Sequence, residues 1–494
     1  MNAKLTKLRL TLPLLSLLIA APVAMSADGS SFLHDTLLKS DRTGETVLAA
    51  LRVTGDADLL PLFEALSRSP QDDRREFAID ALWKVCKQSA VPALLERVNK
   101  DQNVMLRRLA LAYLLDLKAI TPAQLQEAMA SSDPGVRCLA ARGLVKADQK
   151  ELARPALEEL AKADDGRTSD LAATTLLAMG QTQYLQRICQ HATNKATRDE
   201  DVVLLLKAAQ EDETGALADL TKQLAQSDRP GPVQIQAFAV LLKVSPQSAP
   251  LATDAITKSQ STVFRTNLLR VLAASTSAQL ELAKLATGEK PLSLLAQLEL
   301  SRKDGLANVQ AICAEALTSE HPVVLDYVLE CAADDIKTRP ADAFAYAAPL
   351  ADFITSVPRD GDAPGPVHMR AAQAATLLIE LGESVSLQRL RDILRGNYDF
   401  RQRAVAAALI RAGGNKNAAD LAIELLESPR EELYMDAVLS LAQARDPRVT
   451  PHLQKIVDQS DRHSVVLVTQ VAWHLVQLQG TSKAAASQLA KLVK

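Results

Sequence analysis

The stretch DPGVRCLAARGL, residues 133–144, decides the fold of this chain. Counted from Arg137, the apolar residues Ala140, Ala141 and Leu144 lie three, four and seven positions on, which places them on one face of an α-helix. Asp133 precedes Arg137 by four positions, and its side chain can cap the free backbone N–H groups of a first helical turn. The stretch therefore predicts a helix that begins at Asp133 and buries an apolar face.

The same register recurs along the chain. It is repeated from Arg75, Arg108, Arg265 and Arg403, and more loosely from Arg370. Ser261 and Asp399 stand where Asp133 stands in the first stretch. Helical periodicity predicts further first helices of the same kind, so that their starts fall near residues 44, 72, 103, 133, 167, 199, 231, 261, 290, 321, 366, 399, 430 and 462.

A second amphipathic helix is predicted after each first helix, for example over residues 91–98, 151–161, 387–394 and 449–457. A hairpin of two such helices hides only one face, so neighbouring hairpins must stack to form a continuous core. The sequence predicts an all-α fold of about 14 helical hairpins, stacked into a curved superhelix over residues 28–494. We expect second helices to line its concave face, and each register Arg to reach the Asp or free carbonyls of a neighbouring hairpin.

The stretch at Asp133, and a similar one at residues 399–410, resembles the short bacterial form of the HEAT repeat. That form is named from phycobilisome lyase subunits and has the core D-x-x-V-R-x-x-A-A-x-A-L. Near residue 430, Tyr434 stands where the Arg is expected. Armadillo and tetratricopeptide arrays are alternatives, although an aromatic content of 3% disfavours the latter. The resemblance implies a right-handed superhelix, that is, a HEAT- or armadillo-like solenoid, and, as an alternative function, a lyase-like or enzyme-associated subunit.

Residues 1–27 have the layout of a cleaved export signal. Lys4, Lys7 and Arg9 precede an apolar segment at residues 10–21, and small residues between Ala24 and Ala27 suit cleavage. The apolar segment is shorter than the roughly 20 residues of a membrane-spanning helix. We therefore expect a periplasmic or secreted protein without stable membrane insertion after cleavage.

The charge of the chain disfavours nucleic acid as a partner. Removing the three basic residues of the signal from 56 Lys and Arg leaves 53, against 59 Asp and Glu, which is a net charge of −6. Nucleic-acid binding needs a basic stripe that displaces counterions. We expect another protein as the partner.

Sequence motifs of catalysis are missing. None of the seven His is followed by Glu, and the chain has no HExxH, CxxC, GxSxG or GxxxxGK[ST]. We predict no enzyme, no cofactor and no metal site. The five cysteines are interpreted as small buried side chains, and pairing of Cys313 with Cys331 on successive helices stays open.

One step of the repeat is longer than the others, between the predicted starts at 321 and 366. The extra residues fall within an irregular insertion at 334–366, which is either a neutral break between two sub-arrays or a contact surface, since insertions in solenoids often lie on the binding face. The candidate contact residues are Arg339, Phe344, Tyr346, Arg359, Asp360 and Asp362. Together these observations predict a non-catalytic, protein-binding scaffold of the cell envelope or periplasm.

Overall fold

The computed structural model describes residues 44–163, 166–210, 215–275, 277–359, 365–396 and 399–479. The predicted export signal lies outside these ranges. Within them the regular structure is entirely helical, with no strand, and no helix is long and apolar enough to cross a membrane. The predicted all-α class is confirmed.

Fourteen first helices appear in the described residues, and each begins within three residues of its predicted start. They are α3 (Gly44–Thr54), α5 (Asp72–Ala81), α7 (Val104–Asp116), α9 (Pro134–Lys146), α11 (Gly166–Ala178), α13 (Asp199–Ala209), α15 (Gly231–Val244), α17 (Thr262–Ala273), α19 (Leu292–Lys303), α21 (Pro322–Thr338), α23 (Pro366–Leu381), α25 (Phe400–Arg411), α27 (Glu431–Gln443) and α29 (Val465–Gln479). A short π-helical segment, η2 (Leu82–Cys86), continues α5.

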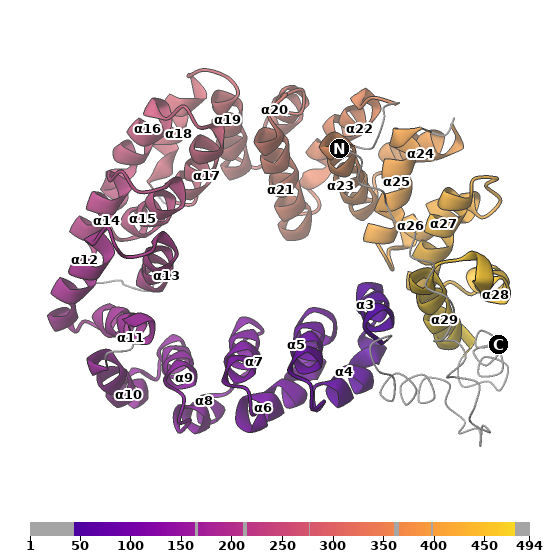
Figure 1. The fold of residues 1–494 in the computed structure, drawn as a ribbon. Helices are drawn as coiled ribbons and strands as arrows, with labels where there is room; N and C mark the ends of the chain where they lie inside the picture. Colours follow the sequence, from indigo (N-terminus) through magenta and orange to yellow (C-terminus); the bar gives the residue numbers. More distant parts are fainter. Residues whose placement is uncertain are drawn as a thin grey trace, which may run out of the picture. The chain divides into compact units, whose positions relative to one another are not determined.

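The second helices alternate with them along the chain (Figure 1). They are α4 (Leu60–Leu66), α6 (Val91–Lys100), α8 (Pro122–Met129), α10 (Lys150–Lys162), α12 (Leu185–Thr193), α14 (Ala218–Ala225), α16 (Ala249–Lys258), α18 (Ala278–Ala286), α20 (Val309–Ala316), α22 (Ala347–Ser356), α24 (Ser384–Arg395), α26 (Lys416–Ala422) and α28 (Thr450–Asp458). A 3-10 turn, η6 (Ala343–Tyr346), leads into α22.

The predicted caps explain where these helices begin. The Asp133 carboxylate accepts a hydrogen bond from the backbone N–H of Val136, and the Ser261 hydroxyl accepts one from Phe264. Asp399 caps α25 in the same way. Each cap satisfies a backbone donor that has no partner inside the helix.

The register arginines are only partly the ladder that the sequence predicts. Arg108 donates two hydrogen bonds to Asp133 of the next hairpin, at 2.8 and 2.7 Å, and Arg370 makes a similar pair of bonds to Asp326 of the preceding one. Arg137 instead bonds Glu159, and Arg403 lies over the ring of Phe400. The spacing fixed the position of each Arg on its helix, but the partner depends on which acceptor the neighbouring turn supplies.

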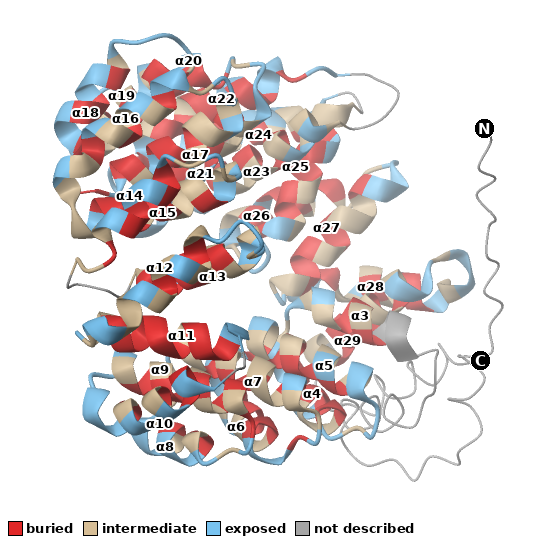
Figure 2. Cartoon of the chain, turned by 60° about the vertical axis from the view of Figure 1, so that its left-hand side comes forward, coloured by how far each residue is buried: buried red, intermediate tan, exposed pale blue. Residues whose placement is uncertain are grey.

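The chain divides into two compact units. Residues 94–390 form the second unit, which therefore contains the whole 334–366 insertion. The first unit combines residues from both ends of the array, up to Ala93 and from Arg391 onward, and within it α3 packs against α29. Buried residues, shown in red in Figure 2, run through the layers of helices in each unit.

In the second unit, the first helices lie on the inner side of the curve and the second helices cover the outer side (Figure 1). Consecutive first helices pack side by side, as α11 does with α13 and α13 with α15. The expectation that second helices line the concave face is wrong. Several second helices pack most extensively against the first helix that follows them, for example α14 against α15, whereas α20 packs more extensively against α19, which precedes it.

Part of the predicted insertion is helical. Residues 334–338 extend α21 to 17 residues, because Ile336 continues the apolar spacing of Ala332 and is buried. The charged residue Asp335 is also buried, because arginine and tyrosine side chains donate hydrogen bonds to its carboxylate. The irregular part of the insertion is thus shorter than the sequence indicates.

Candidate functional site

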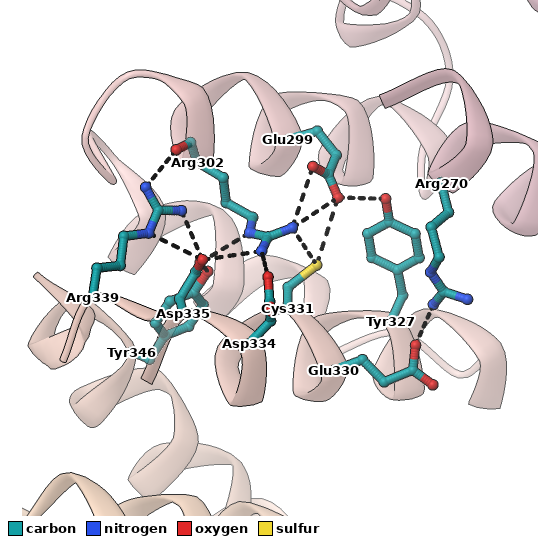
Figure 3. Close-up of polar contacts among 10 residues, drawn as sticks. All are labelled: Arg270, Glu299, Arg302, Tyr327, Glu330, Cys331, Asp334, Asp335, Arg339 and Tyr346. Carbon is teal, nitrogen blue, oxygen red and sulfur yellow. Dashed lines mark hydrogen bonds and ion pairs between the residues drawn. The ribbon is translucent and has the colours of Figure 1, made fainter. Parts of the chain in front are cut away.

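The structure separates the four candidate contact residues that it describes. Arg339 and Tyr346 meet at the C-terminal end of α21, around the carboxylate of Asp335 (Figure 3). Phe344 lies on η6 with an exposed side chain, and Arg359 is exposed on the segment that follows α22. Asp360 and Asp362 lie outside the described residues. Tyr346 is fully buried, so the structure places it in the core rather than on a contact surface.

Asp335 is the centre of a polar cluster that joins α19, α21 and η6. It is 1% exposed, and its two carboxylate oxygens accept five hydrogen bonds. Two come from the guanidinium of Arg302 at 2.9 and 3.0 Å, two from Arg339 at 3.0 and 2.7 Å, and one from the Tyr346 hydroxyl at 2.6 Å. A buried carboxylate is tolerated only with such partners.

Arg302, at the end of α19, connects this centre to a second group of buried side chains. Its Nη2 donates to Asp334 at 2.6 Å, and its Nη1 lies 3.4 Å from both oxygens of Glu299 and 3.6 Å from the Cys331 sulfur. Its backbone carbonyl accepts a 2.6 Å hydrogen bond from Arg339. The two arginines therefore tie α19 to the C-terminal end of α21.

Glu299 is the acceptor of the second group. The Tyr327 hydroxyl donates to it at 2.6 Å, and the Cys331 thiol donates at 3.6 Å. Tyr327 is fully buried, and the guanidinium of Arg270 from α17 lies 4.8 Å from the centre of its ring. Arg270 also forms an ion pair with Glu330 (Figure 3). The cluster thereby reaches across three first helices.

The cluster sets the protonation of its members. Burial alone would raise the pKa of Asp335, but the hydrogen bonds from Arg302, Tyr346 and Arg339 outweigh burial and hold that pKa below its ordinary value. Burial, together with the charge of Glu299, raises the pKa of Cys331 above the usual thiol range. Burial likewise raises the pKa of Cys313 to about 12.

The chemistry open to this cluster follows from those pKa values. Its carboxylate Asp335 is fully engaged by donors, and its thiol is protonated at neutral pH and therefore a poor nucleophile. Cys313 and Cys331 are both free rather than paired. Among the described residues, no group of three or more His, Cys, Asp and Glu side chains could hold a metal ion. The cluster acts as a brace that fixes η6, and with it the exposed Phe344, against α19 and α21.

Sequence reasoning identified Arg339 and Tyr346 but assigned them to a contact surface, and it missed Glu299, Arg302, Tyr327 and Asp335. One local signal was available. Asp335 and Arg339 are four residues apart, the spacing at which opposite charges meet on a helix. Arg302 and Asp335 are 33 positions apart, and this separation carries no such signal, because their contact depends on how α19 packs on α21.

No protein-family model matches the chain, and its sequence matches no curated protein. Similar solved structures include a mutant of Kap121p, at a TM-score of 0.38, 11% identity and 92% coverage of this chain, and the Kap95:Nup1 complex at 0.36, 12% and 86%. A homology model of the full-length AP-3 complex gives 0.38, 11% and 93%, and the match covers 92% of its chain. The matches cover 57% of the Kap121p chain and 56% of the Kap95 chain.

Proposed function

We propose that the chain is a non-catalytic, protein-binding scaffold that is exported to the cell envelope or periplasm. The observation that carries the proposal is the layer of first helices on the inner side of the second unit, from α7 to α23. The side chains of these helices that point away from the second helices are exposed or half-buried. Neighbouring first helices are in contact, so the layer is one continuous surface. A stable protein interface needs about 800 Å² from each partner.

Two further features support a scaffold. The buried polar cluster around Asp335 is saturated with hydrogen bonds and stiffens the array at α19 and α21. A rigid array loses little conformational entropy when a partner binds, and this favours affinity. The proposed location depends on the export-signal layout of residues 1–27.

Capture of partners by the full chain tests the proposal. The tagged protein is expressed with its own N-terminus, the cell is fractionated, and proteins that co-purify from the envelope fraction are identified by mass spectrometry. We expect the chain in that fraction, with at least one protein retained in stoichiometric amount. Recovery of the chain from the cytoplasm, or without any retained protein under mild cross-linking, would contradict the proposal.

The contact role of the 334–366 segment has its own test. A chain that lacks residues 356–366 and a chain with Phe344→Ser are used as bait beside the intact chain. We expect each change to weaken retention of the partner, because Phe344 is the exposed apolar residue that the brace positions. Leu280→Ser, a change of another exposed apolar residue on α18, is the matched control.

A further inference from the structure

Five consecutive first helices of the second unit carry an aliphatic residue at the same position. These residues are Leu109, Leu139, Leu171, Val203 and Ile235, from α7, α9, α11, α13 and α15. Each is the fifth or sixth residue of its helix, each is half-buried, and they follow one another at intervals of 30 or 32 residues. We call them the aliphatic ridge. The next position in the series is the polar Asn267 on α17, where the ridge ends.

Helix geometry places the ridge on the open side of the layer. In α9, Leu139 shares a stripe with Arg142 and Lys146, three and seven residues on, whereas Ala140, Ala141 and Leu144 are fully buried, and α9 packs against α8 and α10. Consecutive helices from α7 to α15 pack side by side, at a typical axial separation of about 10 Å. The five residues thus line up over roughly 40 Å.

A basic border runs along the C-terminal side of the ridge. Between the ridge residue and the C-terminal end of each helix, the five helices carry four basic residues and one acidic residue. The basic residues are Arg142, Lys146, Lys207 and Lys243, and the acidic residue is Asp116. Lys243 bonds the carbonyl of Gln210. The side chains of Arg142 and Lys207 make no hydrogen bond or ion pair to another described residue, and Lys207 is exposed. A guanidinium or ammonium group without an acidic partner can form a charge-assisted hydrogen bond with the carboxylate of a docking segment.

We propose that the aliphatic ridge and its basic border bind an amphipathic segment of a partner protein, whose apolar side chains cover the ridge while its carboxylates face Arg142 and Lys207. This inference rests on the proposed scaffold function and names the chemistry of the partner. Apolar burial supplies affinity at about 25 cal/mol per Å². The basic border selects acidic segments and orients them, because charge complementarity gives specificity more than affinity.

A random peptide library displayed on phage and selected against the full chain provides the probe. We expect the selected peptides to combine Leu, Ile or Phe with Asp or Glu, and to bind more weakly as salt is raised. Leu139→Asp combined with Leu171→Asp should weaken them at least tenfold. Leu280→Asp, which changes an exposed Leu of α18, should leave binding unchanged.

Circular dichroism shows whether the ridge variant folds. If it does not fold, the charge variant Arg142→Gln combined with Lys207→Gln tests the proposed binding site instead. It should also weaken the selected peptides at least tenfold and remove their salt dependence. Basic or non-acidic peptides, an absence of selected binders, or equal binding to the charge variant and the intact chain would each overturn the inference. If these variants still retain the partners that the intact chain captures from cells, the result supports the proposed scaffold function and contradicts the proposed binding site at the ridge.

Discussion

At the scale of single residues, the buried charge of Asp335 shows what the sequence conveys and what it hides. Its spacing to Arg339 is that of a helical ion pair, whereas the repeat spacing predicts that it lies in an irregular insertion. The structure buries Asp335 and leaves Asp334 exposed: Arg302 contacts both carboxylates, but only Asp335 also accepts hydrogen bonds from Arg339 and Tyr346. Burial of a charge depends on partners from distant segments, which a local pattern does not contain.

Asp335→Asn should destabilise the second unit. The amide keeps the shape of the side chain but removes the charge that Arg302 and Arg339 require, and breaking a buried ion pair costs about 3–5 kcal/mol. Urea unfolding and hydrogen exchange of α19 and α21 measure the change. Asp334→Asn, which alters an exposed partner of the same Arg302, should cost less than about 1 kcal/mol. Equal effects of the two changes would show that the brace is not formed.

Gly135→Ala should break the contact between two hairpins. A Cβ at Gly135 would lie 2.2 Å from Nε of Arg108, so Arg108 must leave Asp133 or α9 must shift. Overpacking of this kind costs about 1–3 kcal/mol. The pKa of Asp133, which the hydrogen bond from Arg108 lowers, should move back toward its ordinary value, and NMR titration of the carboxyl can follow it. Gly166→Ala, whose Cβ meets nothing within 4 Å, is the control and should not destabilise.

At the scale of elements, the sequence predicts helices well because their determinants are local. The cap at Asp133 and the apolar spacing after it set the start of α9, and the same reasoning located the other first helices. The side of the layer that a helix occupies is not local. First and second helices are both amphipathic, so periodicity alone does not say which set lines the inner side of the curve.

One element carries a pH-sensitive residue. His474 of α29 is 4% exposed, and burial, partly offset by Asp56 and reinforced by Arg445, lowers its pKa to about 4. The unfolded chain takes up this proton near pH 6.5, before the folded chain does, so the free energy of unfolding should fall as pH drops from 6.5 to 4. The loss is at most about 3 kcal/mol.

His474→Gln should remove that part of the pH dependence. Unfolding free energies of the variant and the intact chain, measured between pH 4 and 7, are subtracted so that carboxyl groups with opposite behaviour cancel. Asp436 is such a group, because burial raises its pKa to about 6. His321→Gln, at an exposed His, should leave the curve unchanged. A difference between His474→Gln and the intact chain that does not vary with pH would show that His474 is not buried in solution.

At the scale of the whole molecule, the two ends of the repeat array are in contact within the first unit. α3 packs against α29, the Trp473 Nε1 donates to the Asp56 carboxylate at 2.9 Å, and Arg445 reaches Asp56 and Asp58. These partners are 387 to 417 residues apart. The repeat pattern does not predict such a contact, because the sequence of each terminal hairpin resembles that of any other hairpin.

The hydrogen bond between Trp473 and Asp56 should hold this junction more firmly than the ion pair of Arg445. Trp473 is 3% exposed and donates to a charged acceptor, a bond worth about 1.5–3 kcal/mol, whereas the side chain of Arg445 is 53% exposed and its pair is worth at most about 1 kcal/mol. Trp473→Phe keeps most of the ring packing and should speed hydrogen exchange in α3 and α29 about tenfold or more. Arg445→Gln should speed it less than about fivefold, and added salt should mimic that smaller effect. Exchange in α3 that Trp473→Phe leaves unchanged would mean that the ends of the array do not meet in solution, and α3 would then need another cover for Leu48 and Leu51, which are now buried.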